Sequence, residues 1–174
     1  MITSEQEEKV RGWLTGRMPE QWREVAAPAI TVDREEITVV VALADIALSD
    51  DASDAERNES RLGRIAAWRE ETRDQRITIA REAEQRFDRK VAWGARLGEQ
   101  GQLFTHLAVP VMTRLRQPQR MVLDTLVDAG VARSRSEALA WCVRLVGEHE
   151  DEWLAELRTA MSHVADVRDR GPQS

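Results

Sequence analysis

The stretch VMTRLRQPQRMVLDTL, residues Val111–Leu126, changes its periodicity at Pro118. Before the proline, apolar and polar residues alternate, which is typical of a half-buried strand. After the proline, apolar residues recur at helical spacing. Proline is favoured in the first turn of a helix, so the stretch predicts a strand to Gln117 followed directly by a helix. The polar face of the predicted strand carries two arginines, Arg114 and Arg116.

The residues after this stretch predict two further helices. The first helix is expected to end near Ala129, because Gly130 suits the position just past a helix end. Ser134-Arg-Ser-Glu137 has the composition of a capping box, and the apolar run ALAWCVRLV follows it. A helix that is apolar on nearly every side must be covered on every side, and a partner subunit would supply that cover. A final amphipathic helix is predicted over residues 152–168.

This order of strand, helix, glycine turn, serine cap and apolar helix resembles the ribbon-helix-helix family of bacterial DNA-binding proteins, to which the Arc and MetJ repressors belong. The motifs that carry the resemblance are MTRLRQP, VLDTLVDAG and SRSEALA, within residues 111–146, about a fifth of the chain. The resemblance implies that two chains pair their strands antiparallel. The resulting two-stranded ribbon enters the major groove of double-stranded DNA, which is wide enough to admit it.

The resemblance also assigns roles to residues of the predicted strand and of the turn before the apolar helix. Strand side chains alternate between two faces, and arginine can donate two hydrogen bonds to guanine, worth about 1–3 kcal/mol of discrimination. The residues that would contact bases are Met112, Arg114 and Arg116. A helix N-terminus suits a phosphate group, and family members clamp the DNA backbone at this turn. The residues that would contact phosphate are Arg133, Ser134, Arg135 and Ser136.

The same resemblance implies a homodimer held together by apolar side chains of the strand and both helices. The implied dimer core consists of Val111, Leu115, Leu123, Leu126, Leu139, Trp141, Cys142, Val143 and Val146.

The residues alone leave alternatives open. Arg114 and Arg116 also fit the wet face of an ordinary half-buried strand, and Ser134 also fits a helix cap with no ligand. The apolar helix also fits the core of a monomer that the N-terminal region covers. The strand at 111–117 could equally pair within a sheet of its own chain, because a hairpin is predicted just before it.

Residues 1–109 predict an α+β accessory domain, and residues 110–174 the DNA-binding and dimerisation region. The whole chain is therefore expected to be α+β, with an N-terminal helix, antiparallel strands and a long helix before the ribbon-helix-helix-like unit and its extra amphipathic helix. In the N-terminal region, we expect a helix with a Ser4–Glu7 capping box over Ser4–Met18 and one or two strands within Ile30–Leu43. Asp54–Arg89 predicts either one long helix with a solvated charged centre or two helices, and Lys90–Val109 predicts a hairpin.

Charge and composition set limits on the class of protein. The 174 residues carry a net charge of −6 and are 42% hydrophobic. However, residues 110–147 hold six basic and three acidic residues, a net +3, and charge acts over only about 10 Å. No run approaches eighteen apolar residues, so no membrane partner is expected, and the acidic start of the chain predicts a cytoplasmic protein.

The sequence gives no pattern for catalysis or metal binding. The single cysteine, Cys142, sits in an apolar run and fits a small buried hydrophobe. The histidines His106, His149 and His163 lack metal-ligand spacing, so no catalytic residue, metal or cofactor is predicted, and the protein is not expected to be an enzyme.

The functional hypothesis is a dimeric, sequence-specific DNA-binding protein that regulates transcription. The alternative is a protein-interaction or scaffold protein that uses the same unit only to dimerise. Residues 1–109 contain no recognised ligand motif, and a ligand or protein partner at that domain is left open.

Overall fold

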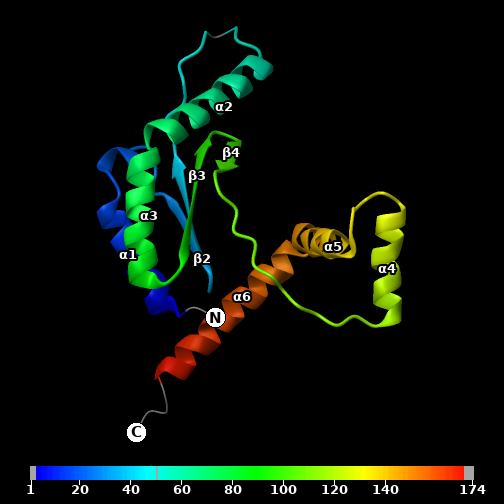
Figure 1. Cartoon of the computed structure of the whole chain (residues 1–174). Helices are drawn as coiled ribbons and strands as arrows, with labels where there is room; N and C mark the ends of the chain where they lie inside the picture. The colour runs from blue at the N-terminus through cyan, green and yellow to red at the C-terminus, as the bar shows by residue number, and fades with distance from the viewer. Residues whose placement is uncertain (1–2, 50, 171–174) are drawn as a thin grey trace. The chain divides into compact units, whose positions relative to one another are not determined.

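The computed structural model of the chain describes residues 3–49 and 51–170. The fold is mixed α+β, with six α-helices and one four-stranded sheet among the described residues. It divides into two compact units, Met1–Val109 and Pro110–Ser174, which Figure 1 traces from blue to red along the chain. The sheet lies wholly within the first unit, whereas the second unit is helical.

The first unit contains three α-helices, a short 3-10 helix and the four strands. In chain order these are α1 Ser4–Arg17, η1 Glu20–Trp22, β1 Ala29–Val32, β2 Glu36–Ala42, α2 Asp54–Glu71, α3 Arg73–Phe87, β3 Lys90–Leu97 and β4 Gln100–Leu103. The strand order is β1-β2-β3-β4. The β1–β2 and β3–β4 pairs are antiparallel, and β2–β3 is parallel. A parallel pair needs a long crossover, which α2 and α3 supply.

Alternating residues of the two central strands form the core of this unit. Ile37, Val39 and Val41 of β2 are buried, and β2 pairs in register with β3, so that Val39 lies opposite Trp93 and Val41 opposite Ala95. Side chains from α1, α2 and α3 belong to the same apolar cluster. The helices therefore cover one face of the sheet, which explains why these β-branched strands are almost entirely apolar on that face.

The start of α1 differs from the prediction by one residue. Thr3, not Ser4, caps the helix: its side chain accepts from the backbone N–H of Gln6, and the Gln6 side chain accepts from the N–H of Thr3. Threonine and glutamine form the same reciprocal capping box as serine and glutamate. The pairs Thr3–Gln6 and Ser4–Glu7 both fit the pattern, and the structure has the first.

Residues 54–89 form two helices, α2 and α3, which meet at Thr72. The charged stretch around this junction is not wholly solvated. Arg76 is only 8% exposed. Its guanidinium lies 4.9 Å from the ring centre of Phe104 and 5.7 Å from that of Trp68, and it donates to the Thr72 hydroxyl at 3.0 Å. Burial lowers the pKa of Arg76. The expectation of a solvated centre was wrong at this residue, because aromatic faces and a hydroxyl compensate its burial.

The predicted hairpin is present but shorter than expected. Its turn lies at Gly98, which adopts a left-handed φ of 58°, and β4 ends at Leu103. Residues 105–109 continue as coil and not as strand.

The second unit contains α4 Gln117–Asp128, α5 Arg135–His149 and α6 Asp151–Arg170. Gly130 has a φ of 75° and terminates the turn after α4, as its position in the sequence predicted. The α4–α5 pair encloses a small core in which Leu123, Ala132 and Ala138 are buried.

The strand predicted up to Gln117 is absent from the single chain. Residues 105–116 are described and have no strand structure. Strand hydrogen bonds need a neighbouring strand, and β4 ends before this segment without pairing to it. The predicted strand is thus not formed by residues 111–116 of one chain, and its pairing with a second chain stays a prediction.

Candidate nucleic-acid interface

The segment before α4 lies open to solvent. Val111 is 86% exposed and Met112 is 96% exposed, and Arg114 and Arg116 are exposed as well. Leu115 is the exception, because it is half-buried and packs against the α4–α5 core. The three residues predicted to contact bases are thus accessible, while Val111, predicted to be in the dimer core, is uncovered in one chain.

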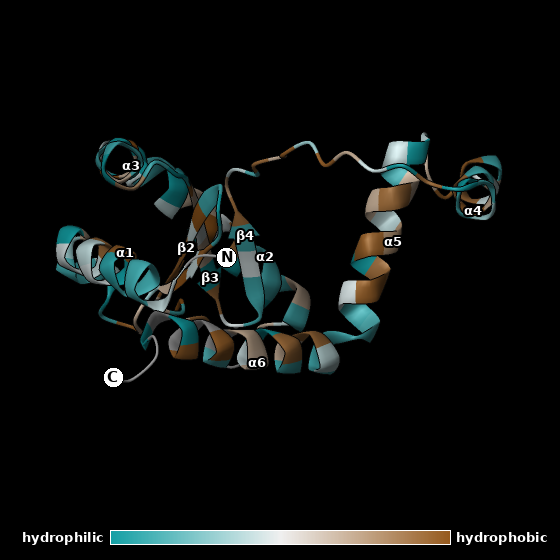
Figure 2. Ribbon diagram, turned by 90° about the horizontal axis from the view of Figure 1, so that it is seen from below, coloured by the Kyte–Doolittle hydropathy of each residue, from teal (hydrophilic) through white to brown (hydrophobic). Residues whose placement is uncertain are grey.

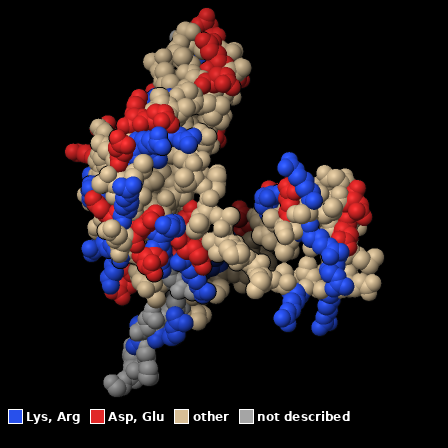
Figure 3. Space-filling view, in the orientation of Figure 1, with Lys and Arg blue, Asp and Glu red and all other residues tan. Residues whose placement is uncertain are grey.

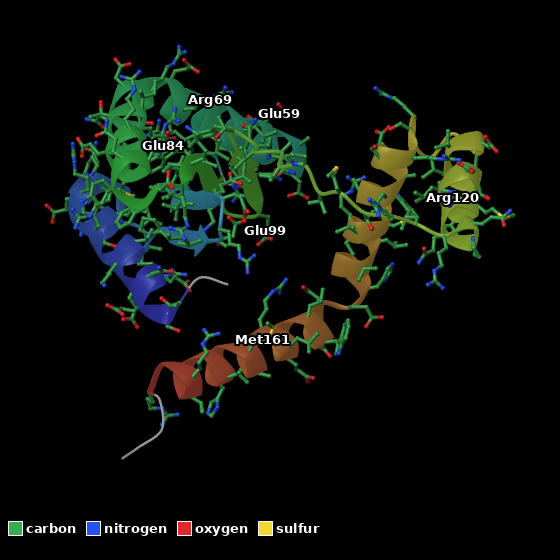
Figure 4. All side chains as sticks on the ribbon, turned by 60° about the horizontal axis from the view of Figure 1, so that its bottom comes forward. Glu59, Arg69, Glu84, Glu99, Arg120 and Met161 are labelled. Carbon is green, nitrogen blue, oxygen red and sulfur yellow. The ribbon has the colours of Figure 1, made fainter. Side chains whose placement is uncertain are left out.

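Two hydrogen bonds fix the end of this segment on α4. The backbone N–H of Arg116 donates to Oε1 of Gln119 at 2.8 Å. The guanidinium of Arg120, labelled in Figure 4, donates to the backbone carbonyl of Leu115 at 2.7 Å. The backbone that carries Arg114 and Arg116 is therefore anchored to the first turn of α4. Of these two hydrogen bonds, the one to the glutamine three residues after the cap could have been anticipated from the sequence.

The start of α5 is closed by its own side chains. The Ser134 hydroxyl accepts from the N–H of Glu137 at 3.2 Å, and the N–H of Arg133 donates to Oε2 of Glu137 at 2.7 Å. Arg135 forms a two-pronged ion pair with Asp124 of α4, at 2.6 and 2.7 Å. All four residues from Arg133 to Ser136 are exposed, but the side chains of Ser134 and Arg135 have partners within the chain. Sequence reasoning missed the Arg135–Asp124 pair, since no short-range pattern links residues eleven apart.

This ion pair shifts the pKa values of both of its members. The hydrogen bond from Arg135 lowers the pKa of Asp124, and the hydrogen bond to Asp124 raises the pKa of Arg135. A lowered carboxyl pKa means that the pair stabilises the fold above the ordinary carboxyl value of about 3.9, and that this contribution is lost as pH falls through the folded pKa. The effect on stability is expected to be small, because both groups are exposed.

We expect the Arg135→Gln variant to raise the pKa of Asp124 toward its ordinary value. A carboxyl-carbon NMR titration of Asp124 in both proteins measures this directly. Arg133→Gln is the matched control, because Arg133 is also an exposed arginine of the same turn but its side chain is not the partner of Asp124. An unchanged Asp124 midpoint in Arg135→Gln would contradict the ion pair.

The residues predicted to form a dimer core fall into three groups. Leu123 is buried, and Leu115, Leu126, Leu139, Trp141 and Cys142 are half-buried. The third group is exposed and includes, beside Val111, Val143 at 65% and also Val146. Figure 2 shows the apolar bands along α5. Several further apolar side chains of the unit are exposed as well, namely Met121, Val122, Val131 and Leu145, together with Trp153, Leu157, Met161, Val164 and Val167 of α6. The unit therefore leaves many apolar side chains exposed around a small buried core.

Basic side chains project from the same unit. Figure 3 shows lysine and arginine in blue. Within residues 110–147 of this unit the basic residues are Arg114, Arg116, Arg120, Arg133, Arg135 and Arg144. The described residues of the chain contain no helix long and apolar enough to cross a membrane. Nor do they bring three or more histidine, cysteine or acidic side chains together in a group that would suit a metal ion.

Fold and surface together define a two-unit α+β protein whose helical C-terminal unit carries an exposed arginine-bearing segment and an uncovered apolar face. Residues 8–103 match the model of the Rv1265-like protein N-terminal domain, and residues 116–168 match that of the Mb1296 C-terminal domain. The chain belongs to the Rv1265-like family.

Its relatives include uncharacterized proteins of two mycobacteria. It is 58% identical over 160 residues to the uncharacterized protein Mb1296 of Mycobacterium bovis and to the uncharacterized protein Rv1265 of Mycobacterium tuberculosis. Each alignment covers 92% of this chain and 69% of the relative. No solved structure matches the chain significantly. None of these descriptions mentions a ribbon-helix-helix protein, so that resemblance still rests on residues 111–146 of this sequence alone.

Proposed function

We propose that this protein is a homodimeric, sequence-specific DNA-binding protein that regulates transcription from the cytoplasm. Residues 111–116 of two chains would pair as an antiparallel ribbon and enter the major groove. The observation that carries the proposal is an exposed, alternating, arginine-bearing segment held directly before a helix pair whose apolar face is uncovered. In this arrangement the ribbon-helix-helix-like unit is the C-terminal region, and the α+β unit is accessory to it.

Pairing would complete two features that one chain leaves unfinished. The backbone of residues 111–116 would gain strand partners, and Val111 would move from solvent to the covered face of the ribbon. Val143 and Val146 would be buried between copies of α5. Exposed apolar patches of this kind are typical of interaction surfaces.

Local charge supports DNA as the partner. The net +3 of residues 110–147 favours a polyanion in spite of the net −6 of the whole chain. Arg114 and Arg116 are exposed on the segment that would form the ribbon, where bidentate contacts to guanine are favourable. Exposed Arg133 and Ser136 remain suited to phosphate contacts, whereas Arg135 would have to leave Asp124 to make one.

The second candidate function is a protein-interaction or scaffold role in which the same unit only dimerises. The Ser134 cap, the bond from the N–H of Arg133 to Glu137 and the Arg135–Asp124 pair favour it, because they occupy groups that would otherwise meet phosphate. Both functions require a dimer, so DNA binding is what separates them.

The test is selection from a random duplex DNA library at near-physiological salt. We expect wild-type protein to enrich a palindromic or tandem motif and the Arg114→Ala/Arg116→Ala variant to lose it, since each bidentate arginine–guanine pair supplies about 1–3 kcal/mol of discrimination. Affinity should also fall steeply with salt as counterions are released.

The matched control is Arg23→Ala/Arg81→Ala, which removes two exposed arginines from the other unit and should leave the enriched motif unchanged. A folded wild-type dimer that enriches nothing would overturn the DNA-binding proposal and favour the scaffold role.

A further inference from the structure

The last helix of the second unit carries an apolar stripe along its length. The stripe contains Trp153, Leu157, Val164 and Val167 of α6, all exposed, with Trp153 at 54% and Val164 at 65%. Ala160 completes the stripe and is exposed as well. Figure 2 shows apolar bands along α6, and none of the described side chains of α6 belongs to the α4–α5 core. The helix pair of its own unit therefore leaves this stripe uncovered.

The stripe has the spacing of a seam between two helices. Its five members follow one another at intervals of four, three, four and three residues. A mean interval of 3.5 residues keeps the side chains of one helix against a neighbouring helix along its length, as in coiled coils. Met161, labelled in Figure 4, is exposed too and extends the stripe along one edge. The stripe therefore fits the surface of another helix.

The charges along α6 select an antiparallel direction for a second copy. Residues 148–156, from the end of α5 into α6, hold five carboxylates and neither lysine nor arginine. Residues 157–170 hold three arginines and two carboxylates, a net +1, and Arg168 and Arg170 lie in the last turn. Parallel copies would set the two blocks of −5 side by side, which is unfavourable. Antiparallel copies instead set each block beside the arginine-bearing end of the other.

The helix dipole does not account for this distribution of charge. A dipole favours carboxylates in the first turn of a helix, and its effect falls off within that turn. The first turn of α6 holds only Asp151 and Glu152 of the five carboxylates. Glu148, Glu150 and Glu156 lie outside it, so the acidic block is larger than a single helix needs.

The two ends of α6 are complementary to each other, which makes a second copy the partner. A twofold contact uses the same surface on both chains, so that surface must be self-complementary. α6 spans 20 residues, just under three heptads, whereas the heptad pattern of a free-standing coiled coil usually extends over three to four. The helix pair therefore adds to chains that are already held together, where the effective concentration of the second α6 is high.

We propose that α6 pairs antiparallel with α6 of a second copy of this chain, along the stripe of residues 153, 157, 160, 164 and 167. The pair is a second contact of the dimer, beside the ribbon and α5. The inference rests on the dimer of the proposed function, and not on DNA binding.

Site-directed cross-linking of the full chain tests the pairing and its direction. Cys142→Ser removes the single native cysteine, and two differently tagged chains are coexpressed, one with Trp153→Cys and the other with Val167→Cys. An antiparallel pair brings these two positions together, whereas like chains hold their cysteines about 21 Å apart along the helix, at 1.5 Å per residue. A thiol cross-linker that spans about 8 Å, the rise of about five residues, should therefore join the mixed pair and neither like pair.

The matched control uses Ala155→Cys in place of Trp153→Cys. Ala155 is exposed and lies two residues from Trp153, but it points about 200° around the helix from it. The cysteine is then at the same end of α6 and on the face away from the stripe. It should not link to Val167→Cys.

A substitution within the stripe tests the same contact without cysteine chemistry. Val164→Asp places a carboxylate in an apolar seam, so it should raise the dimer dissociation constant about tenfold, while the ribbon and α5 still hold the chains. Ala155→Asp adds the same charge on the far face and should leave the constant unchanged. Sedimentation over a range of concentrations measures both.

Four results would overturn the inference. They are cross-linking of the like pairs instead of the mixed pair, no cross-link in any of them, a link from Ala155→Cys as strong as that from Trp153→Cys, or an unchanged dimer dissociation constant in Val164→Asp. A protein with the α6 link that enriches no DNA motif would lose the DNA-binding function alone. A protein that enriches a motif without the link would lose this contact alone.

Discussion

The Val143→Asp variant is expected to be a monomer and to lose sequence-specific DNA binding. Val143 is an exposed apolar side chain of α5, and the proposed dimer buries it. A carboxylate buried there without a partner would be strongly unfavourable, so the dimer dissociation constant should rise at least about 100-fold. Specific binding would fall with it, because a ribbon needs a strand from each chain.

Sedimentation of wild type and variant over a range of concentrations measures this effect. Ile77→Asp is the matched control, because Ile77 is an exposed aliphatic residue of α3 in the first unit. It carries the same change of charge and should leave the dimer intact. A wild-type protein that is monomeric at about 100 μM, or a Val143→Asp variant that still dimerises like wild type, would refute the α5 interface.

Two glycine substitutions are expected to change the free energy of unfolding in opposite directions. A Cβ atom at Gly94 of β3 would lie 2.8 Å from the backbone oxygen of Gln102 and 2.8 Å from Cδ2 of Leu103. The backbone of β4 cannot yield as a flexible side chain would, so Gly94→Ala must force β3 and β4 apart. We expect it to destabilise the first unit by about 1–3 kcal/mol.

Gly63 of α2 gives the contrasting case. A Cβ atom there meets nothing within 4 Å. Because alanine loses less conformational freedom than glycine in a helix, Gly63→Ala should stabilise the unit by about 0.5–1 kcal/mol. Thermal unfolding followed by circular dichroism measures both, at about 4–8 °C per kcal/mol for a domain of this size. If Gly94→Ala melted with the wild type, the close β3–β4 approach would be wrong.

The sequence by itself determined the elements whose signals are local. The cap at Ser134 and Glu137 could be predicted because its partners lie three residues apart. The end of α4 could be predicted because the turn after it needs a positive φ, which glycine adopts readily and Gly130 has. The β-branched run of residues 30–43 predicted one strand or two, and the structure has two there, β1 and β2. The mixed α+β class follows from such local periods.

The tertiary structure alone decided which elements pair and which charged groups are buried. The parallel β2–β3 pair depends on the path of α2 and α3, and the burial of Arg76 depends on Phe104, which is 28 residues away. The Arg135–Asp124 pair likewise joins distant residues. Residues 111–116 form no strand in one chain although their alternation predicts one. The physical reason is common to all of these: a capping hydrogen bond is satisfied within one turn, whereas a strand, a buried cation or an ion pair between distant residues exists only when a second segment supplies its partner.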